Sequence, residues 1–300
     1  MLKVGVNLPS FGVDETAGVR EHARHAEELG LESIWVGDHL IPVRPFLDST
    51  MVLATAAAVT EHVKIGFGVM VLALRPAAWA AKQIASLQHL SGGRVLLGIG
   101  SGGSVHGDAA WRAVGIPYAE RAQRTDAALE ILPSLVEGKP TNVNGEVITL
   151  SPGATMPPLL IGAGPMRRAA RFADEWYPAF STPAEIAEQT RRLAGLAAEY
   201  GRPAPRVTIG LSVGLGDLPA SVIDAQARSL MEYGMTEAEA RGGLVTGPPA
   251  AAAERLAALA EVGVHRVIAM PFPADRLRQS ELLAETNRLL NGRPKPAAVR

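Results

Sequence analysis

Among the residues that could do chemistry, one histidine stands out by its position. His39 follows the apolar run Ile34-Trp-Val-Gly-Asp38, which is typical of a buried strand, so we expect it where that strand ends. An imidazole titrates near neutral pH and can give or take a proton. The alternative is a histidine that is simply satisfied within the structure. We predict a role in proton transfer, with Asp38 either holding the ring or capping the next segment.

A cluster of small residues follows a second apolar run. Val95-Leu-Leu-Gly-Ile-Gly-Ser-Gly-Gly-Ser104 ends in glycines, which accept positive φ and let a ligand approach closely. The cluster therefore predicts the ligand-facing end of a buried strand. Gly98, Gly100 and Gly103 also match the G-x-G-x-x-G pattern of dinucleotide folds, but no helix follows at once and no acidic residue closes a next strand. A tight turn or a different cofactor pocket is favoured over NAD.

A third glycine-rich turn ends the run at Ile161. Pro165 suits the first turn of a helix there, and free amides at such a turn attract an anion. Arg167 and Arg168 would help if they point inward, and the alternative is an ordinary turn with solvated arginines. We predict an anion site formed by Gly162, Ala163, Gly164 and Pro165.

Short apolar runs alternate with amphipathic segments along the chain. The predicted strands are Lys3–Leu8, Ser33–Val36, Val63–Gly68, Arg94–Ile99, Leu159–Ile161, Glu175–Pro178, Val207–Val213 and Val264–Met270. The predicted helices are Thr16–Leu29, Thr50–Glu61, Ala77–Leu90, Tyr118–Val136, Pro183–Tyr200 and Pro249–Val262. Continuously apolar strands between helices indicate a parallel sheet, and eight of them favour a (β/α)8 TIM barrel. No linker or shift in composition divides residues 1–300, so we expect one domain.

Two segments interrupt this alternation. Ser101–Pro117 is long and rich in glycine, which predicts an active-site loop in which Trp111 is either core or the roof of a pocket. Pro140–Leu150 is polar and contains Asn144-Gly145, a strong signal for a β-hairpin.

Composition and the predicted strand ends exclude several functions. The net charge of −1 gives no electrostatic attraction to nucleic acid or membranes, and the absence of cysteine excludes thiol chemistry. No lysine falls at a predicted strand end, which disfavours Schiff-base enzymes, and potential metal ligands there are too few for a metal-dependent hydrolase. The strand ends are mostly small or apolar, a good lining for a flat aromatic cofactor. Without a signal peptide or a membrane-length apolar run, we expect a cytoplasmic protein.

The chain resembles the luciferase-like monooxygenase superfamily, specifically its branch that depends on the deazaflavin coenzyme F420. The resemblance covers almost the whole chain and rests on Ile34–His39, Gly66–Met70, Gly92–Gly100, Gly115–Arg121, Ile161–Pro165 and Arg171–Trp176. It implies a TIM barrel with an insertion after strand four, usually a homodimer. It also implies a non-prolyl cis peptide around Val69-Met70 that backs the cofactor ring.

The same resemblance implies which residues meet the cofactor. His39 would lie near the reactive face of the ring, and Gly162 to Pro165 near the phosphate. The implied cofactor-binding residues are Asp38, His39, Val69, Met70, Ser101, Gly102, Gly162, Ala163, Gly164 and Pro165. The chain departs from F420-dependent sugar-phosphate dehydrogenases at Gly103, where they have a glutamate, and it lacks their tryptophan shortly after the His39 position. This disfavours sugar-phosphate oxidation.

We therefore predict an F420-dependent oxidoreductase that transfers a hydride between the deazaflavin and a small organic substrate. His39 is its predicted proton donor or acceptor. The main alternative is an FMN-dependent luciferase-like monooxygenase that uses reduced flavin and O2 in the same pocket. A third alternative is a flavin-binding barrel without turnover.

Overall fold

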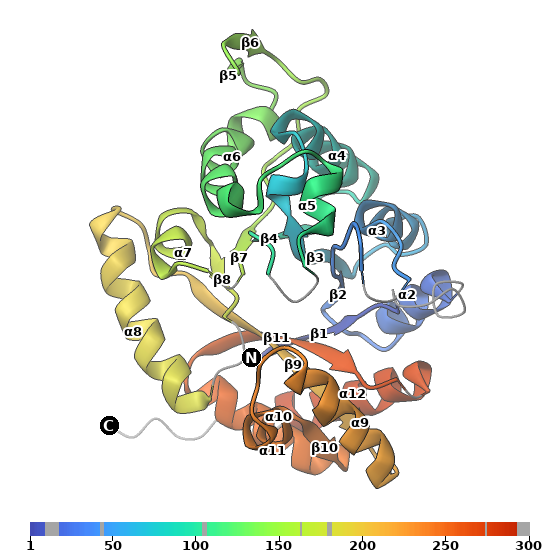
Figure 1. Ribbon diagram of the computed structural model, residues 1–300. Coiled ribbons are helices and arrows are strands. Elements are labelled where there is room, and N and C mark those ends of the chain that lie inside the picture. Colours follow the sequence, from blue (N-terminus) through green and yellow to red (C-terminus); the bar gives the residue numbers. More distant parts are fainter. Residues whose placement is uncertain are drawn as a thin grey trace.

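The computed structural model describes residues 1–9, 18–42, 45–103, 107–162, 164–178, 182–273 and 275–292. Eight parallel strands close into a barrel in the order β9-β11-β1-β2-β3-β4-β7-β8-β9 (Figure 1). They are β1 Lys3–Asn7, β2 Ser33–Val36, β3 Lys64–Val71, β4 Val95–Gly100, β7 Leu159–Ile161, β8 Glu175–Trp176, β9 Arg206–Leu215 and β11 Val264–Pro271. Each corresponds to a predicted strand, and the predicted TIM barrel is confirmed.

Helices cover the outside of the barrel (Figure 1). They are α2 Val19–Glu28, α3 Ser49–Ala57, α4 Ala77–Leu90, α6 Arg121–Val136, α7 Met166–Phe172, α8 Pro183–Glu199, α9 Ala220–Met231, α10 Glu237–Gly243, α11 Pro249–Glu261 and α12 Arg276–Asn291. The six predicted helices are confirmed with shifted ends, although residues 16 and 17 of the first lie outside the described residues. Helix α7 begins directly after Pro165, where a first helical turn was expected, whereas helices α9, α10 and α12 were not predicted. A ninth strand, β10 Val245–Gly247, was also missed; it pairs with β9 outside the closed barrel.

The connection from β4 to β7 contains an insertion, and its β-hairpin extends away from the barrel (Figure 1). It contains α5 Ala109–Ala113, the 3-10 turn η2 Tyr118–Glu120, α6, and the antiparallel strands β5 Thr141–Val143 and β6 Glu146–Ile148. The predicted hairpin is confirmed: Asn144 and Gly145 have φ of 54° and 92°, as a tight two-residue turn requires. The predicted loop Ser101–Pro117 contains helix α5, and its residues 104–106 lie outside the described residues.

Large and small side chains alternate inside the barrel. The ring of Trp35 on β2 is fully buried against Gly66 on β3, where a Cβ atom would lie 2.3 Å from the ring. Gly5 on β1 leaves room for the other side of the same ring, because a Cβ there would lie 2.7 Å from its Nε1 atom. Trp35 then packs with Leu96, Leu160 and Ile268. The glycines therefore allow a tryptophan to fill the barrel interior.

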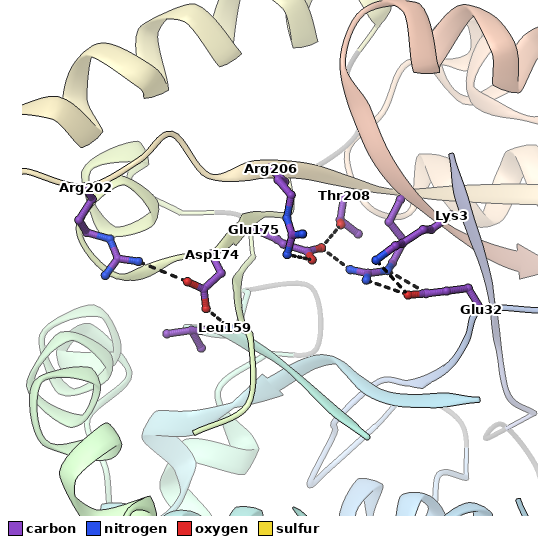
Figure 2. Close-up of polar contacts among 9 residues, drawn as sticks. Lys3, Glu32, Leu159, Asp174, Glu175, Arg202, Arg206 and Thr208 are labelled. Atoms are coloured by element: carbon purple, nitrogen blue, oxygen red, sulfur yellow. Dashed lines mark hydrogen bonds and ion pairs between the residues drawn. The ribbon is translucent and has the colours of Figure 1, made fainter. Parts of the chain in front are cut away.

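Charged side chains close the barrel at the N-terminal ends of its strands (Figure 2). Glu175 on β8 is fully buried and accepts from Thr208 Oγ1 at 2.5 Å and from Arg206 Nη2 at 3.0 Å. Arg266 on β11 pairs with the same carboxylate. It also binds both oxygens of Glu32 at 3.0 Å, while Lys3 approaches Glu32 to 3.6 Å. The buried charges at this end are therefore satisfied by one another.

Candidate active site

A cavity of about 290 Å³ opens where β2, β3 and β4 end. Three segments that are distant in sequence form most of its lining. They contribute Gly37, Asp38, His39, Leu40 and Ile41 after β2; Gly68, Val69, Val71 and Leu74 in β3 and the 3-10 turn η1 Leu72–Leu74; and Gly102, Gly103, Gly107, Ala110 and Trp111 after β4. Tyr233, just beyond α9, completes it. The cavity thus lies at the C-terminal ends of the strands, where TIM-barrel enzymes place their chemistry.

His39 lies in this lining and is half-buried. Its ring meets the edge of Phe46, with centroids 5.1 Å apart and planes at 79°. An aromatic neighbour in this arrangement limits how the imidazole can turn. The predicted position at a strand end is therefore observed, and the catalytic role of His39 stays a prediction.

Asp38 is buried, and its carboxylate is engaged by the protein itself. It accepts from Ser49 Oγ and from the Val71 backbone N–H, both at 2.8 Å. The guanidinium of Arg75 donates to its two oxygens at 2.6 and 2.7 Å. The expected cap of the following helix is instead Asp48, which accepts from the Met51 N–H of α3. Asp38 lines the cavity, but its carboxylate is used to hold neighbouring segments of the protein together.

The side chain of Val69 occupies a cradle of glycines. Its methyl groups lie 3.1, 2.6 and 3.2 Å from where Cβ atoms would stand at Gly98, Gly100 and Gly162. Gly98 also passes the backbone of β3, because a Cβ there would lie 2.1 Å from the Phe67 oxygen. The expectation that the whole glycine cluster faces a ligand is therefore wrong for Gly98 and Gly100, which make room for β3.

Val69 belongs to a bulge in β3. The register with β4 shifts between Phe67 and Met70, and the Gly68–Val69 peptide bond is cis. The non-prolyl cis bond is thus one bond earlier than the expected Val69-Met70. Met70, predicted to bind the cofactor, has a fully buried side chain in the main core and does not line the cavity. This alternation follows from the strand geometry, since neighbouring residues point to opposite faces.

Beyond the strand end, the glycines after β4 do face the cavity. Gly102 has a φ of 73°, and its missing Cβ would lie 2.9 Å from the ring of Trp111. A Cβ at Gly103 would meet no atom of the described residues within 4 Å, and Gly103 lines the cavity. Trp111 is 3% exposed and lines the cavity, so it is both core and wall. Ser101 lies between Gly100 and Gly102 but is not among the lining residues.

The predicted anion site lies beside the cavity. Gly162 is in contact with Val69, Gly164 and Pro165 are exposed, and Ala163 lies outside the described residues. Arg167 is exposed and pairs with Glu199 at 2.9 Å, so it does not meet the condition of pointing inward that its help at the turn required. Arg168 is buried and pairs with Asp126 at 2.5 Å, while its Nη1 atom lies 3.1 Å from where a Gly164 Cβ would stand. A guanidinium therefore lies next to the turn, although an aspartate already balances its charge.

Sequence reasoning missed Arg75, Tyr233, Leu40 and Ile41. Arg75 was missed because the strand was predicted to end at Gly68. In the structure β3 continues to Val71 and η1 to Leu74, directly before Arg75. Tyr233 reaches the cavity from a part of the chain for which no element was predicted. Within the described residues, no group of three His, Asp or Glu side chains could hold a metal ion. Nor does any described helix have the length and apolar character needed to cross a bilayer.

Comparison with known proteins gives one family. Residues 3–266 match the family of luciferase-like monooxygenases. F420-dependent glucose-6-phosphate dehydrogenase of Amycolatopsis mediterranei is 30% identical over 224 residues, which are 63% of this chain and 66% of that protein. Curated relatives from mycobacteria are matched over 58% of their length, so the chain spans less than two thirds of the relatives that it resembles.

Solved structures show the same fold at low identity. An F420-dependent secondary alcohol dehydrogenase with an F420-acetone adduct has a TM-score of 0.83 and 16% identity, covering 96% of this chain and 99% of that one. The oxygenating constituent of 3,6-diketocamphane monooxygenase from Pseudomonas putida, solved with FMN, has a TM-score of 0.75 and 17% identity, covering 94% and 97%. Deazaflavin and flavin enzymes thus share this barrel.

Proposed function

Since the chain belongs to the luciferase-like monooxygenase family, we propose that it is an F420-dependent oxidoreductase acting on a small organic substrate. The observation that carries the proposal is the cavity itself. It brings His39 within the same lining as the Val69 bulge and the glycines after β4, and its described lining is mostly small or apolar. The F420-dependent relative and the F420-dependent structural neighbour support the choice of deazaflavin.

The residues present fit a flat ring with a phosphate tail. Val69, held by its glycine cradle, would form one wall, and the open space at Gly103 leaves room beside it. Ser101 and Gly102 would contact the ring system, and Gly162, Gly164 and Pro165 would hold the phosphate, together with the backbone of Ala163. When bound, F420 supplies the hydride chemistry.

The chain's own residues would orient the substrate and manage the proton. Transfer of a hydride to or from a neutral alcohol or carbonyl must be balanced by a proton at the substrate oxygen. His39 would hold that proton, because its imidazole lies in the lining and an imidazole can both give and take a proton. Leu40, Ile41 and Tyr233, all exposed beside the cavity, would keep water from the reacting atoms once substrate is bound.

An FMN-dependent monooxygenase is the second candidate. The likeness to a monooxygenase solved with FMN favours it, because that protein has the same fold at nearly full coverage. In this reading the same cavity would take reduced flavin and O2. A homodimer in solution is also proposed, and light scattering on the purified protein tests it.

Titration of the protein with F420 and with FMN, followed by fluorescence, separates the two candidates. We expect F420 to bind with a Kd of about 1 μM or lower, which corresponds to about 8 kcal/mol, and FMN to bind more weakly. Saturable FMN binding with no detectable F420 binding would overturn the proposal in favour of the monooxygenase. Binding of either without turnover of alcohols, aldehydes or ketones would indicate a flavin-binding barrel without catalysis.

A further inference from the structure

Arg75 lies outside the cavity lining yet contacts the segments that form it. It follows η1, and its guanidinium binds both oxygens of Asp38, at 2.6 and 2.7 Å. The same group reaches Asp48 at 3.8 Å. Asp38 and Asp48 stand at the two ends of the loop that carries His39, Leu40 and Ile41. One side chain therefore holds both ends of the loop that lines one wall of the cavity.

Through Asp38, this contact extends to the neighbouring strand β3, which also lines the cavity. The Asp38 carboxylate accepts from the backbone N–H of Val71 at 2.8 Å, and Val71 lies two residues beyond the Val69 bulge. It also accepts from Ser49 Oγ at the start of α3. The His39 loop, the β3 bulge and α3 thus meet at a single carboxylate.

This ion pair is well shielded from solvent. The side chain of Asp38 is 4% exposed and that of Arg75 is 18% exposed. Burial alone would lower the pKa of Arg75, but the hydrogen bonds and charge of Asp38, with the charge of Asp48, outweigh it and raise the pKa. A bidentate pair fixes orientation as well as distance, and removing one partner leaves the other charged group buried without compensation.

We propose that Arg75 is a positioning residue: by clamping Asp38, it sets the His39 loop and the Val69 bulge at the separation that cofactor and substrate require. This inference rests on the proposed function, because it assumes that the cavity binds a deazaflavin or a flavin. The physical reason is that a displacement of about 1 Å in a binding group can cost about 100-fold in rate.

Arg75→Gln and the milder Arg75→Lys test the clamp in the 300-residue chain. Amide hydrogen exchange of Val71 is measured without any cofactor, and the Kd is then measured for whichever of F420 and FMN the wild type binds. In Arg75→Gln we expect Val71 to exchange at least about tenfold faster and the Kd to rise by about tenfold or more. Arg75→Lys keeps the charge but loses the bidentate contact, so its changes should be smaller.

Arg266→Gln and Arg266→Lys are the matched controls. Arg266 is also a buried arginine in a carboxylate pair, but it lies at the N-terminal ends of the strands. We expect these variants to lower the Tm at least as much while leaving the Kd and the exchange of Val71 within about twofold.

The clamp is overturned if both Arg75 variants keep wild-type exchange at Val71 and a wild-type Kd. It is also overturned if Arg266 variants of equal Tm lose as much affinity, because general destabilisation would then explain the effect. Failure of the proposed function looks different: the wild type would bind neither F420 nor FMN. Exchange at Val71 would still decide whether Arg75 holds the bulge.

Discussion

The two ends of the barrel solve different physical problems. At the N-terminal ends of the strands, Glu175 and Arg266 are buried within a network of opposite charges (Figure 2). At the C-terminal ends, glycines and apolar side chains surround a cavity in which His39 is the titratable group that we expect to react. At the N-terminal ends the charged groups bind one another. At the C-terminal ends there is space for a ligand, and His39 lines that space. Stability and reactivity should therefore respond to different substitutions.

The cavity end nevertheless contains a buried ion pair between Asp38 and Arg75. Asp38 and Arg75 resemble the opposite end in burial, but they bind backbone and loop segments that form the cavity wall. A charged pair near the site is thus used to place other residues. If the two ends are independent, substitutions at the cavity end should change activity, and substitutions at the charged end should change stability.

The largest effect is expected from His39→Ala. Loss of a positioned acid or base should lower kcat by about 10²–10⁴-fold, while the Kd for the cofactor stays within about tenfold. The pH–rate profile should also lose a limb near the histidine pKa. Steady-state kinetics across pH and a fluorescence titration measure both.

His265→Ala is the control at the opposite end of the barrel, on β11. Burial lowers the pKa of His265, and the residue lies far along the strand from the cavity side, so kcat should be unchanged. Near-normal turnover of His39→Ala with an unchanged pH profile would make His39 structural. A collapse of cofactor affinity would make it a ligand of the cofactor.

Next in size is Arg266→Met, which removes the buried cation of Glu175 and leaves the half-exposed Arg206 as the remaining cation on that carboxylate. Breaking a buried pair in this way should lower the free energy of unfolding by about 3 kcal/mol, measured by urea denaturation. Adding Glu175→Gln should restore part of the loss, because the poorly compensated charge is removed. Cofactor affinity of the folded protein should not change. An equal loss of affinity would mean that the two ends are coupled.

The barrel could be predicted from the sequence because its signal is local. Strands such as Val95–Gly100 are buried on both faces, so each is a continuous apolar run, and the helices between them show regular apolar spacing. Length does not separate the elements that were missed from those that were predicted. β10 has three residues, but so does the predicted β7, and the longer helices α9 and α12 were missed as well.

The site was predictable only in part, because contacts across strands leave no local pattern. The end of β2 pointed to His39, but nothing in the sequence shows that Gly98, Gly100 and Gly162 receive the side chain of Val69. The same glycines would look identical whether they faced a ligand or a neighbouring strand. For Asp38 the sequence suggested a partner of the His39 ring or a cap of the next segment. Its actual partner, Arg75, lies 37 positions away, and no local pattern connects the two.

A smaller effect is expected from Gly103→Leu. A Cβ added there would meet no described atom within 4 Å, and the φ is ordinary, so we expect the new side chain to fit and to fill cavity space. We expect the KM for substrate or the Kd for cofactor to rise by about tenfold, with the Tm nearly unchanged. Gly195→Leu, on α8 and equally open, is the matched control and should change neither constant. Unchanged binding in Gly103→Leu would place the ligand elsewhere.

The smallest effect concerns acid stability at the charged end. Burial alone would raise the pKa of Glu32, but the hydrogen bonds and charge of Arg266 outweigh it, so the pKa in the folded protein lies below the usual 4.5. A carboxyl group with a lowered folded pKa stabilises the fold above its unfolded pKa, and that contribution disappears as the pH falls through the folded value. Urea unfolding of the wild type should therefore show stability falling below about pH 4.5, and Glu32→Gln should flatten this decline. Because Glu32 is 24% exposed, solvent screening keeps the change small.

Glu188→Gln, on α8, serves as the control and should retain the wild-type slope. An unchanged slope in Glu32→Gln would mean that Arg266 is held mainly by Glu175, and that the charged end depends on one ion pair instead of a shared network.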